Sequence, residues 1–269
     1  MIEPIQAVGL GVVEGLTEFL PVSSTGHLIL ASRLLGLQGQ AADTFTVVIQ
    51  AGALGAVIGL YRARLAALWH GWRGRDPVGR RLLWNLGISV LPALVAGAAL
   101  HRVIKAQLFG TQPVVMALAL GGVAMLAVAR FTRPGRRLAS VDAVTSREAL
   151  LIGLAQCLAL WPGMSRAMVT MVAGLLLGWP ATVAAEYSFL VALPTLGAAT
   201  AFDAALGGPG LMAEVGALSL ACGFITAAAV AAVAIRGLLQ YLTRHGLALF
   251  GWYRLALAAA VWMGMRSAG

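Results

Sequence analysis

The sequence predicts an all-α polytopic membrane protein, and three observations support this fold class. Hydrophobic residues fill 60% of the 269 positions and charged residues 11%, whereas an average soluble domain is roughly 25% charged. Apolar runs close to the roughly 20 residues that a helix needs to cross a bilayer recur along the whole chain. The two halves of the chain also resemble each other. We therefore expect a single membrane domain over 1–269, built as an inverted-topology repeat of about 1–135 and 145–269.

Apolar segments of two lengths occur along the chain. Those long enough to span cover residues 43–61, 82–100, 112–131, 183–204, 213–236 and 246–265. Shorter ones, paired around Pro21 and around Pro162-Gly163, cover 3–20 with 24–37 and 148–161 with 165–178. Because a short segment cannot cross and its backbone must stay hydrogen-bonded, we expect about six spanning helices and two re-entrant helical hairpins.

A shift of 141 to 142 residues lays the second half over the first. Glu14 then falls on Gln156, and Pro21 to Ser24 falls on Pro162 to Ser165. Each half reads as one hairpin followed by three spans. Since three is an odd number, the two halves have opposite orientations in the membrane.

Positive charge is concentrated in connections that this topology places on one side. The connections 62–81 and 130–148 are rich in arginine, and the second contains Arg133, Arg136 and Arg137. By the positive-inside rule this side is cytoplasmic, so the first hairpin opens to the outer face. The net charge of +9 lies at the ends of spans rather than on a soluble basic domain, so we expect no nucleic-acid partner.

A pair of carboxylates lies in the first hairpin. Glu14 and Glu18 are four residues apart, which places both on one face of a helix. Two like charges in apolar surroundings need a cation, a shared proton or an arginine. We expect a divalent cation, Mg²⁺ with Ca²⁺ as the alternative, bound together with substrate phosphate oxygens. The competing interpretation is a carboxylate pair solvated at an interfacial helix end.

Each hairpin also contains a helix start with hydroxyl groups. After Pro21, the residues Ser23, Ser24 and Thr25 are N-cap candidates for a helix starting near Gly26. Free N–H groups at such a helix start attract anions. We expect this turn to bind phosphate.

The second hairpin repeats this arrangement and adds a guanidinium group. Gly163 and Ser165 precede Arg166, which lies in an apolar stretch and must face a carboxylate or a phosphate. A structural salt bridge from Arg166 to Glu14 or Glu18 is the alternative.

His27 is the third reactive group of the first hairpin. A lone histidine on an apolar helix is more often a hydrogen-bonded core residue. The nearby carboxylates and hydroxyls favour a role in phosphoryl transfer, either as nucleophile or as a base that activates water or Ser24. The sequence leaves these roles open.

These motifs resemble the bacterial undecaprenyl-diphosphate phosphatase family, membrane proteins linked to bacitracin resistance, over essentially the whole chain. The family's first motif stands here as Glu14 to His27, and its second as Pro162 to Thr170. The second motif departs from the family pattern at Ala167, usually serine, and at Met168, commonly glycine. These departures put substrate preference or rate in doubt more than reaction type.

The resemblance implies hydrolysis of undecaprenyl diphosphate to undecaprenyl phosphate and inorganic phosphate, which recycles the carrier lipid for peptidoglycan and cell-shape maintenance. It further implies divalent-ion dependence, a homodimer and a bacterial inner-membrane location with the site open to the periplasm. A polyprenyl-phosphate transporter or flippase, or a phosphatase for a different polyprenyl diphosphate, are the alternatives. The residues expected to form the site are His27, Glu18, Arg166 and Ser24 as catalytic groups; Thr25, Gly26, Gly163, Ser165 and Thr170 as phosphate ligands; and Glu14 with Glu18 as metal ligands.

Overall fold

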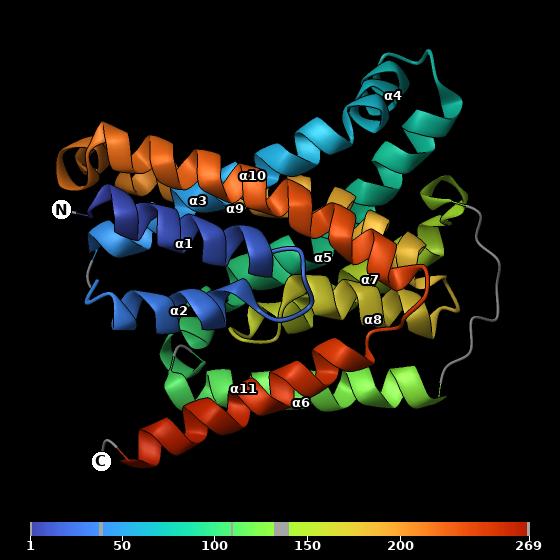
Figure 1. Ribbon diagram of the computed structural model, residues 1–269. Coiled ribbons are helices and arrows are strands. Elements are labelled where there is room, and N and C mark those ends of the chain that lie inside the picture. Colours follow the sequence, from blue (N-terminus) through green and yellow to red (C-terminus); the bar gives the residue numbers. More distant parts are fainter. Residues whose placement is uncertain (1, 38–39, 109, 132–139, 268–269) are drawn as a thin grey trace.

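Helices make up all the regular secondary structure in the described residues, 2–37, 40–108, 110–131 and 140–267, of this computed structural model (Figure 1). The first half contains α1 (Pro4–Thr17), α2 (Ser24–Leu34), α3 (Gln40–Leu60), α4 (Arg62–Trp72), α5 (Pro77–Gln107) and α6 (Thr111–Phe131). The second half contains a short 3₁₀ turn (Val141–Ala143), α7 (Ser146–Gln156), a second 3₁₀ turn (Cys157–Leu160), α8 (Arg166–Leu176), α9 (Ala181–Val215), α10 (Ala217–Leu242) and α11 (Ala248–Ser267).

Five of these helices are long and apolar enough to cross a membrane, and a sixth span results if α3 and α4 count as one bent pair. The predicted class, an all-α polytopic membrane protein, is confirmed. The connection 62–81 contains a helix that was not predicted, because α4 fills much of it and turns away from α3 by 81°. Alanine, leucine and arginine in this segment are good helix formers, so the chain stays helical after leaving the span.

The two short helix pairs enter the bundle from opposite ends. In Figure 1, α1 and α2 have their open end on the left, whereas α7 and α8 open to the right, and the turns of both pairs lie inside the molecule. Neither pair crosses the bundle. This arrangement is the one expected of two re-entrant hairpins.

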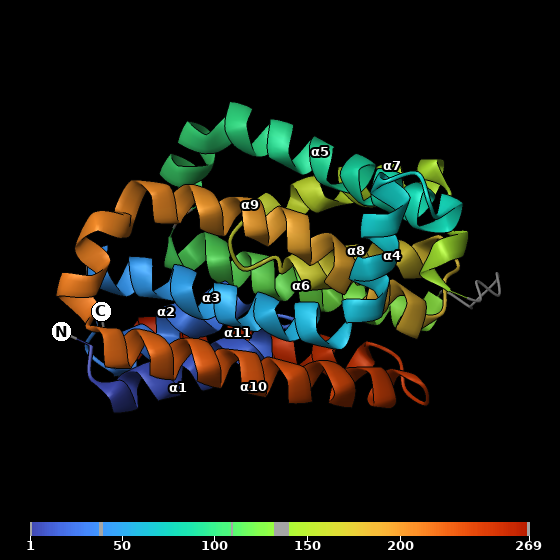
Figure 2. The ribbon, with the colours of Figure 1, turned by 90° about the horizontal axis from the view of Figure 1, so that it is seen from above.

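Packing between the halves is reciprocal. Helix α1 packs against α10, while α7, its counterpart, packs against α5 (Figure 2). Glycines make both approaches close: a Cβ on Gly11 would lie 2.7 Å from the Gly223 carbonyl oxygen, and one on Gly153 would lie 2.8 Å from that of Ser89. This exchange of partners is what the predicted pair of inverted halves would produce.

At the hairpin turns, the predicted match between the two halves of the sequence is off by one residue. Ser23 and Ser165 are the N-caps of α2 and α8, and both have positive φ, 76° and 68°. The counterpart of Ser165 is therefore Ser23, and the expected match of Ser24 with Ser165 is wrong. The helix also starts at Ser24, two residues before the expected Gly26. The reason is that a cap is defined by backbone conformation, which a count from the proline does not fix.

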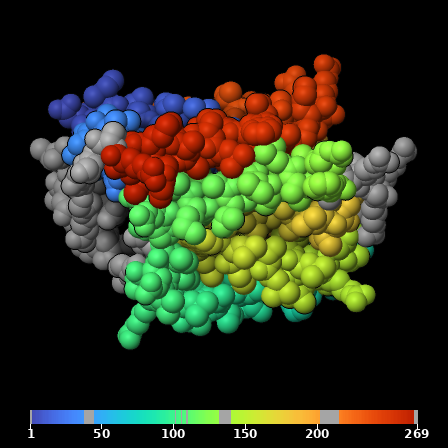
Figure 3. Space-filling view, turned by 90° about the horizontal axis from the view of Figure 1, so that it is seen from below, coloured from blue at the N-terminus to red at the C-terminus, as the bar shows by residue number. Residues whose placement is uncertain are grey.

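The connections that the sequence identifies as basic gather at one end of the molecule. In Figure 1 the α4–α5 turn and the end of α6, which belong to the two arginine-rich connections, lie toward the right, opposite the N-terminus, and the α10–α11 turn lies there too. Arg133, Arg136 and Arg137 fall outside the described residues. The largest apolar cluster includes Phe19, Phe189 and Leu242, and α11 lies alongside α6 (Figure 3).

Candidate functional site

An ion pair joins the two hairpin turns. Glu18, at the C-cap of α1, accepts from Nη2 of Arg166, the first residue of α8, at 3.0 Å. The Ser24 hydroxyl donates to the other carboxylate oxygen of Glu18 at 2.5 Å. The side chains of Arg166 and Glu18 are only 9% and 5% exposed. The structure thus brings together three of the predicted catalytic residues, and it also contains the salt bridge that the alternative interpretation of Arg166 requires.

Helix α9 provides a second set of hydrogen-bond acceptors for the Arg166 guanidinium group. Nη1 of Arg166 donates to the backbone oxygen of Ser188 at 2.9 Å and to its hydroxyl oxygen at 3.3 Å. Thr170, one turn along α8, donates to the Ser188 hydroxyl at 2.7 Å. Buried Nε of Arg166 has no hydrogen-bond partner in the described part of the chain. One N–H of a rigidly held arginine is therefore left for a further acceptor.

Glu14 lies one turn before Glu18 on α1 and is completely buried. Neither of its carboxylate oxygens has a hydrogen-bond partner among the described residues. Burial raises the pKa of the Glu14 carboxyl well above its usual value, and the negative charge of Glu18 raises this pKa further. An unsatisfied buried carboxylate is costly unless a proton or a cation compensates it.

The carboxylate oxygens of Glu14 and Glu18 suit a hard divalent cation that takes its other ligands from elsewhere. Carboxylate oxygens are the ligands that Mg²⁺ and Ca²⁺ prefer, and Mg²⁺ is commonly held by one or two carboxylates plus substrate phosphates. No group of three or more His, Cys, Asp or Glu side chains that could hold a metal occurs within the described ranges. A cation at Glu14 and Glu18 would therefore depend on substrate or water for its remaining ligands.

His27 lies one turn beyond Ser24 on α2, and both of its ring nitrogens are engaged. Nδ1 is 2.7 Å from the backbone oxygen of Ser23, and Nε2 is 2.6 Å from the hydroxyl of Tyr253 on α11. Burial lowers the pKa of His27, and the positive charge of Arg254 lowers it further, while the Ser23 hydrogen bond acts in the opposite direction. His27 is therefore placed as a neutral imidazole at neutral pH.

The predicted phosphate ligands divide into exposed and buried groups. Thr25 is exposed in the first turn of α2, and Gly26 donates its N–H to the Ser23 hydroxyl. Ser165 caps α8 by accepting from the Met168 N–H at 3.2 Å. Thr170 is 1% exposed and contacts Ser188 rather than open space. Its position supports Arg166, and the phosphate-binding role of these residues stays a prediction.

Gly163 and the two departures from the family motif are explained by packing. Gly163 has a φ of 95°, and a Cβ there would lie 2.7 Å from the Val114 carbonyl oxygen, so only glycine fits. Ala167 and Met168 are 1% and 3% exposed and belong to the largest apolar cluster. Their side chains fill the core behind the turn.

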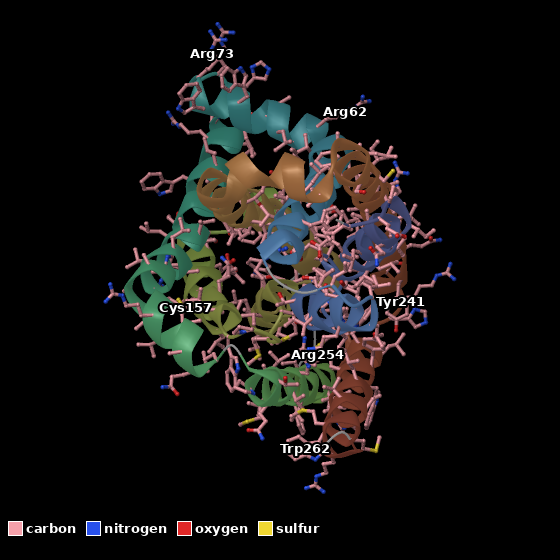
Figure 4. The ribbon with its side chains drawn as sticks, turned by 90° about the vertical axis from the view of Figure 1, so that its left-hand side faces the viewer. Arg62, Arg73, Cys157, Tyr241, Arg254 and Trp262 are labelled. Carbon is pink, nitrogen blue, oxygen red and sulfur yellow. The ribbon has the colours of Figure 1, made fainter. Side chains whose placement is uncertain are left out.

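Sequence analysis missed Arg254, which ties both hairpin turns to α6. It is fully buried and donates to the backbone oxygens of Ala117 and Gly163 at 3.0 and 2.9 Å, and more weakly to that of Pro21 at 3.5 Å. Figure 4 shows it inside the bundle, whereas Trp262 of the same helix lies at the outside. The sequence did contain a signal, because Arg254 is an arginine within an apolar span. Such a residue must have polar partners, as was argued for Arg166. Ser188 carried no comparable signal.

Comparison with known proteins gives a consistent set of matches. Residues 7–260 match the family model described as bacitracin resistance protein BacA. An undecaprenyl-diphosphatase of Sorangium cellulosum is 51% identical over 258 residues, covering 95% of this chain and 84% of that protein. Undecaprenyl-diphosphatase 2 of Rhodospirillum rubrum is 44% identical over 268 residues, covering 98% and 97%. An undecaprenyl-diphosphatase of Methylococcus capsulatus is 45% identical over 257 residues, covering 96% and 93%.

Proposed function

Because this chain belongs to the bacitracin resistance protein BacA family, we propose that it hydrolyses undecaprenyl diphosphate to undecaprenyl phosphate and inorganic phosphate. Water supplies the oxygen that reaches the terminal phosphorus, and the bond from that phosphorus to the bridging oxygen breaks. The lipid keeps one phosphate. This reaction returns the carrier lipid to peptidoglycan and envelope polymer synthesis.

The observation that carries the proposal is the ion pair between Glu18 and Arg166 at the meeting point of the hairpins. Ser188 and Glu18 fix the guanidinium on two sides, and its buried Nε is left without a partner among the described residues. A preorganised arginine beside two helix N-termini stabilises charge on a transferring phosphoryl group. Phosphoryl transfer depends largely on such positioning and electrostatics.

The remaining roles in the proposal follow from position. His27, neutral and held at both nitrogens, is the nucleophile or the base that takes the proton from water or from Ser24. Ser24, hydrogen-bonded to Glu18, lies at the same helix start. Thr25, Gly26, Gly163, Ser165 and Thr170 line or support the two turns that would hold the phosphates.

A divalent cation, Mg²⁺ or Ca²⁺, is part of the proposal, with Glu14 and Glu18 as its protein ligands. The orphaned carboxylate of Glu14 is the feature that supports it. When bound, such a cation neutralises phosphate charge and polarises the phosphoryl oxygens.

Location and assembly complete the proposal. The protein would lie in the bacterial inner membrane with the first hairpin open to the periplasm, which is supported by the grouping of the basic connections at the opposite end of the molecule (Figure 1). A homodimer is expected from the family resemblance alone.

A lipid transporter is the rival, because hairpins entering from opposite ends are also a transporter arrangement. The test uses purified protein in detergent and in sealed vesicles that contain undecaprenyl diphosphate. Hydrolysis predicts free inorganic phosphate in both, and its loss on adding EDTA. Movement of the lipid across the vesicle membrane without released phosphate would favour the transporter. If phosphate is released only from a polyprenyl diphosphate of another chain length, that lipid is the substrate instead.

A further inference from the structure

The hydrogen bonds of His27 determine which ring nitrogen carries the proton. Nδ1 faces the backbone oxygen of Ser23 at 2.7 Å, and a carbonyl oxygen only accepts. In the neutral ring Nδ1 therefore holds the hydrogen, and Nε2 offers its lone pair. The hydroxyl of Tyr253 lies 2.6 Å from Nε2 and is the donor in that contact.

Tyr253 also fixes the plane of the imidazole. The two rings are parallel within 5°, with their centroids 5.6 Å apart. The contact connects α2 with α11 across 226 positions of sequence. Helix α11 is held firmly here, because the next residue, Arg254, is fully buried and donates to backbone oxygens of α6 and of the second hairpin turn.

From this geometry we infer that Tyr253 is a positioning residue for the reaction, which holds His27 in the Nδ1–H tautomer with Nε2 as the reactive nitrogen. The inference rests on the proposed function. A water or phosphate oxygen that enters the site would replace the phenol hydroxyl at a nitrogen that is already deprotonated. Without Tyr253 the Ser23 carbonyl alone holds the imidazole, so the ring can rotate away from it and exchange its proton between the two nitrogens, and fewer molecules have the reactive arrangement.

The test compares Tyr253→Phe with wild type in two independent measurements. The chain contains four histidines, so ¹⁵N-histidine NMR of the detergent-solubilised protein can resolve the tautomer of His27, assigned with His27→Ala. We expect mainly Nδ1–H in wild type and a mixture in Tyr253→Phe. For phosphate release from undecaprenyl diphosphate we expect kcat to fall about tenfold to a hundredfold, the loss typical when the group orienting a functional histidine is removed, with KM changed less than about twofold.

The matched control is Tyr241→Phe, because Tyr241 stacks on a different histidine, His245, with centroids 4.6 Å apart. This variant should keep wild-type kcat. Tyr253→Leu, which loses the ring as well as the hydroxyl, should lose more activity than Tyr253→Phe. An unchanged His27 tautomer, or an unchanged kcat, in Tyr253→Phe would overturn the inference. Absence of phosphate release from wild type would overturn the proposed function. The tautomer measurement does not require activity, so the two outcomes can be distinguished.

Discussion

Nη2 of Arg166 lies 3.0 Å from Oε1 of Glu18, although 148 positions separate the two residues in the sequence. The pair joins the first residue of one re-entrant helix to the last turn of another, from opposite halves of the repeat. Because the two charges share a buried position, neither can be removed without leaving the other uncompensated.

Glu18→Gln should therefore impair both the fold and the reaction. Breaking a buried ion pair costs about 3–5 kcal/mol of stability, and a misplaced Arg166 should lower kcat at least about a hundredfold. Thermal unfolding and phosphate release measure the two effects. Glu186→Gln is the control, since Ser188 faces Arg166 and a residue two positions earlier lies on another side of α9. Equal activity of Glu18→Gln and the control would contradict the assigned role.

The positive φ of Ser165 predicts that a glycine variant is more stable than an alanine variant at this position, the reverse of the usual order in helices. Glycine there removes the cap but suits φ 68°, whereas alanine removes the cap and keeps the strain. We expect Ser165→Ala to be less stable than Ser165→Gly by about 1 kcal/mol, measured by thermal unfolding in detergent. At Ser32, inside α2, the order should be reversed, because alanine is the better helix former. The same order at both positions would contradict the assigned backbone conformation.

The unsatisfied carboxylate of Glu14 predicts a divalent-ion requirement. EDTA should abolish phosphate release, and Mg²⁺ or Ca²⁺ should restore it. Glu14→Gln should raise the Mg²⁺ concentration needed for half-maximal rate by about tenfold or more, as loss of one of two carboxylate ligands implies. Wild-type activity in EDTA would remove the cation from the proposal, while an unchanged Mg²⁺ dependence of Glu14→Gln would remove Glu14 as its ligand.

The pH dependence of the rate should reflect the lowered pKa of His27. Burial is the main cause, and Arg254 adds to it. A base must be unprotonated, so activity is present above the pKa and lost as the pH falls through it. Because the pKa lies below the usual 6.5, the midpoint of the fall in kcat should lie below pH 6.5. An acid limb well above pH 6.5 would contradict a neutral His27 at neutral pH.

Much of the fold could be predicted from the sequence, because the lengths of the apolar segments and the number of spans in each half can be counted directly along the chain. The six predicted spans match α3, α5, α6, α9, α10 and α11, with ends that differ by a few residues. The helix after α3 was not predicted, since its 81° bend depends on three-dimensional packing. The one-residue error in the match of the hairpin turns has a similar origin, because the cap at Ser23 is visible only in its backbone conformation.

The site was predictable where polar residues stand out against apolar neighbours. Glu14, Glu18 and Arg166 satisfy that condition, and the family resemblance drawn from their motifs is confirmed. Tyr253 and Ser188 do not satisfy it, since hydroxyl groups are common at helix ends and within spans. Their contacts with His27 and Arg166 arise only from the packing of α11 and α9. Residue roles in the reaction stay predictions.

The most direct test of the central claim measures phosphate release from undecaprenyl diphosphate by purified wild type, Arg166→Ala and Arg64→Ala in detergent with Mg²⁺. Arg64 is the control because it too forms an ion pair, with Asp142, away from the hairpin turns. The account predicts release by wild type and Arg64→Ala, and loss of at least about a hundredfold in a folded Arg166→Ala. Wild-type release by Arg166→Ala, or no release by folded wild type, would contradict it.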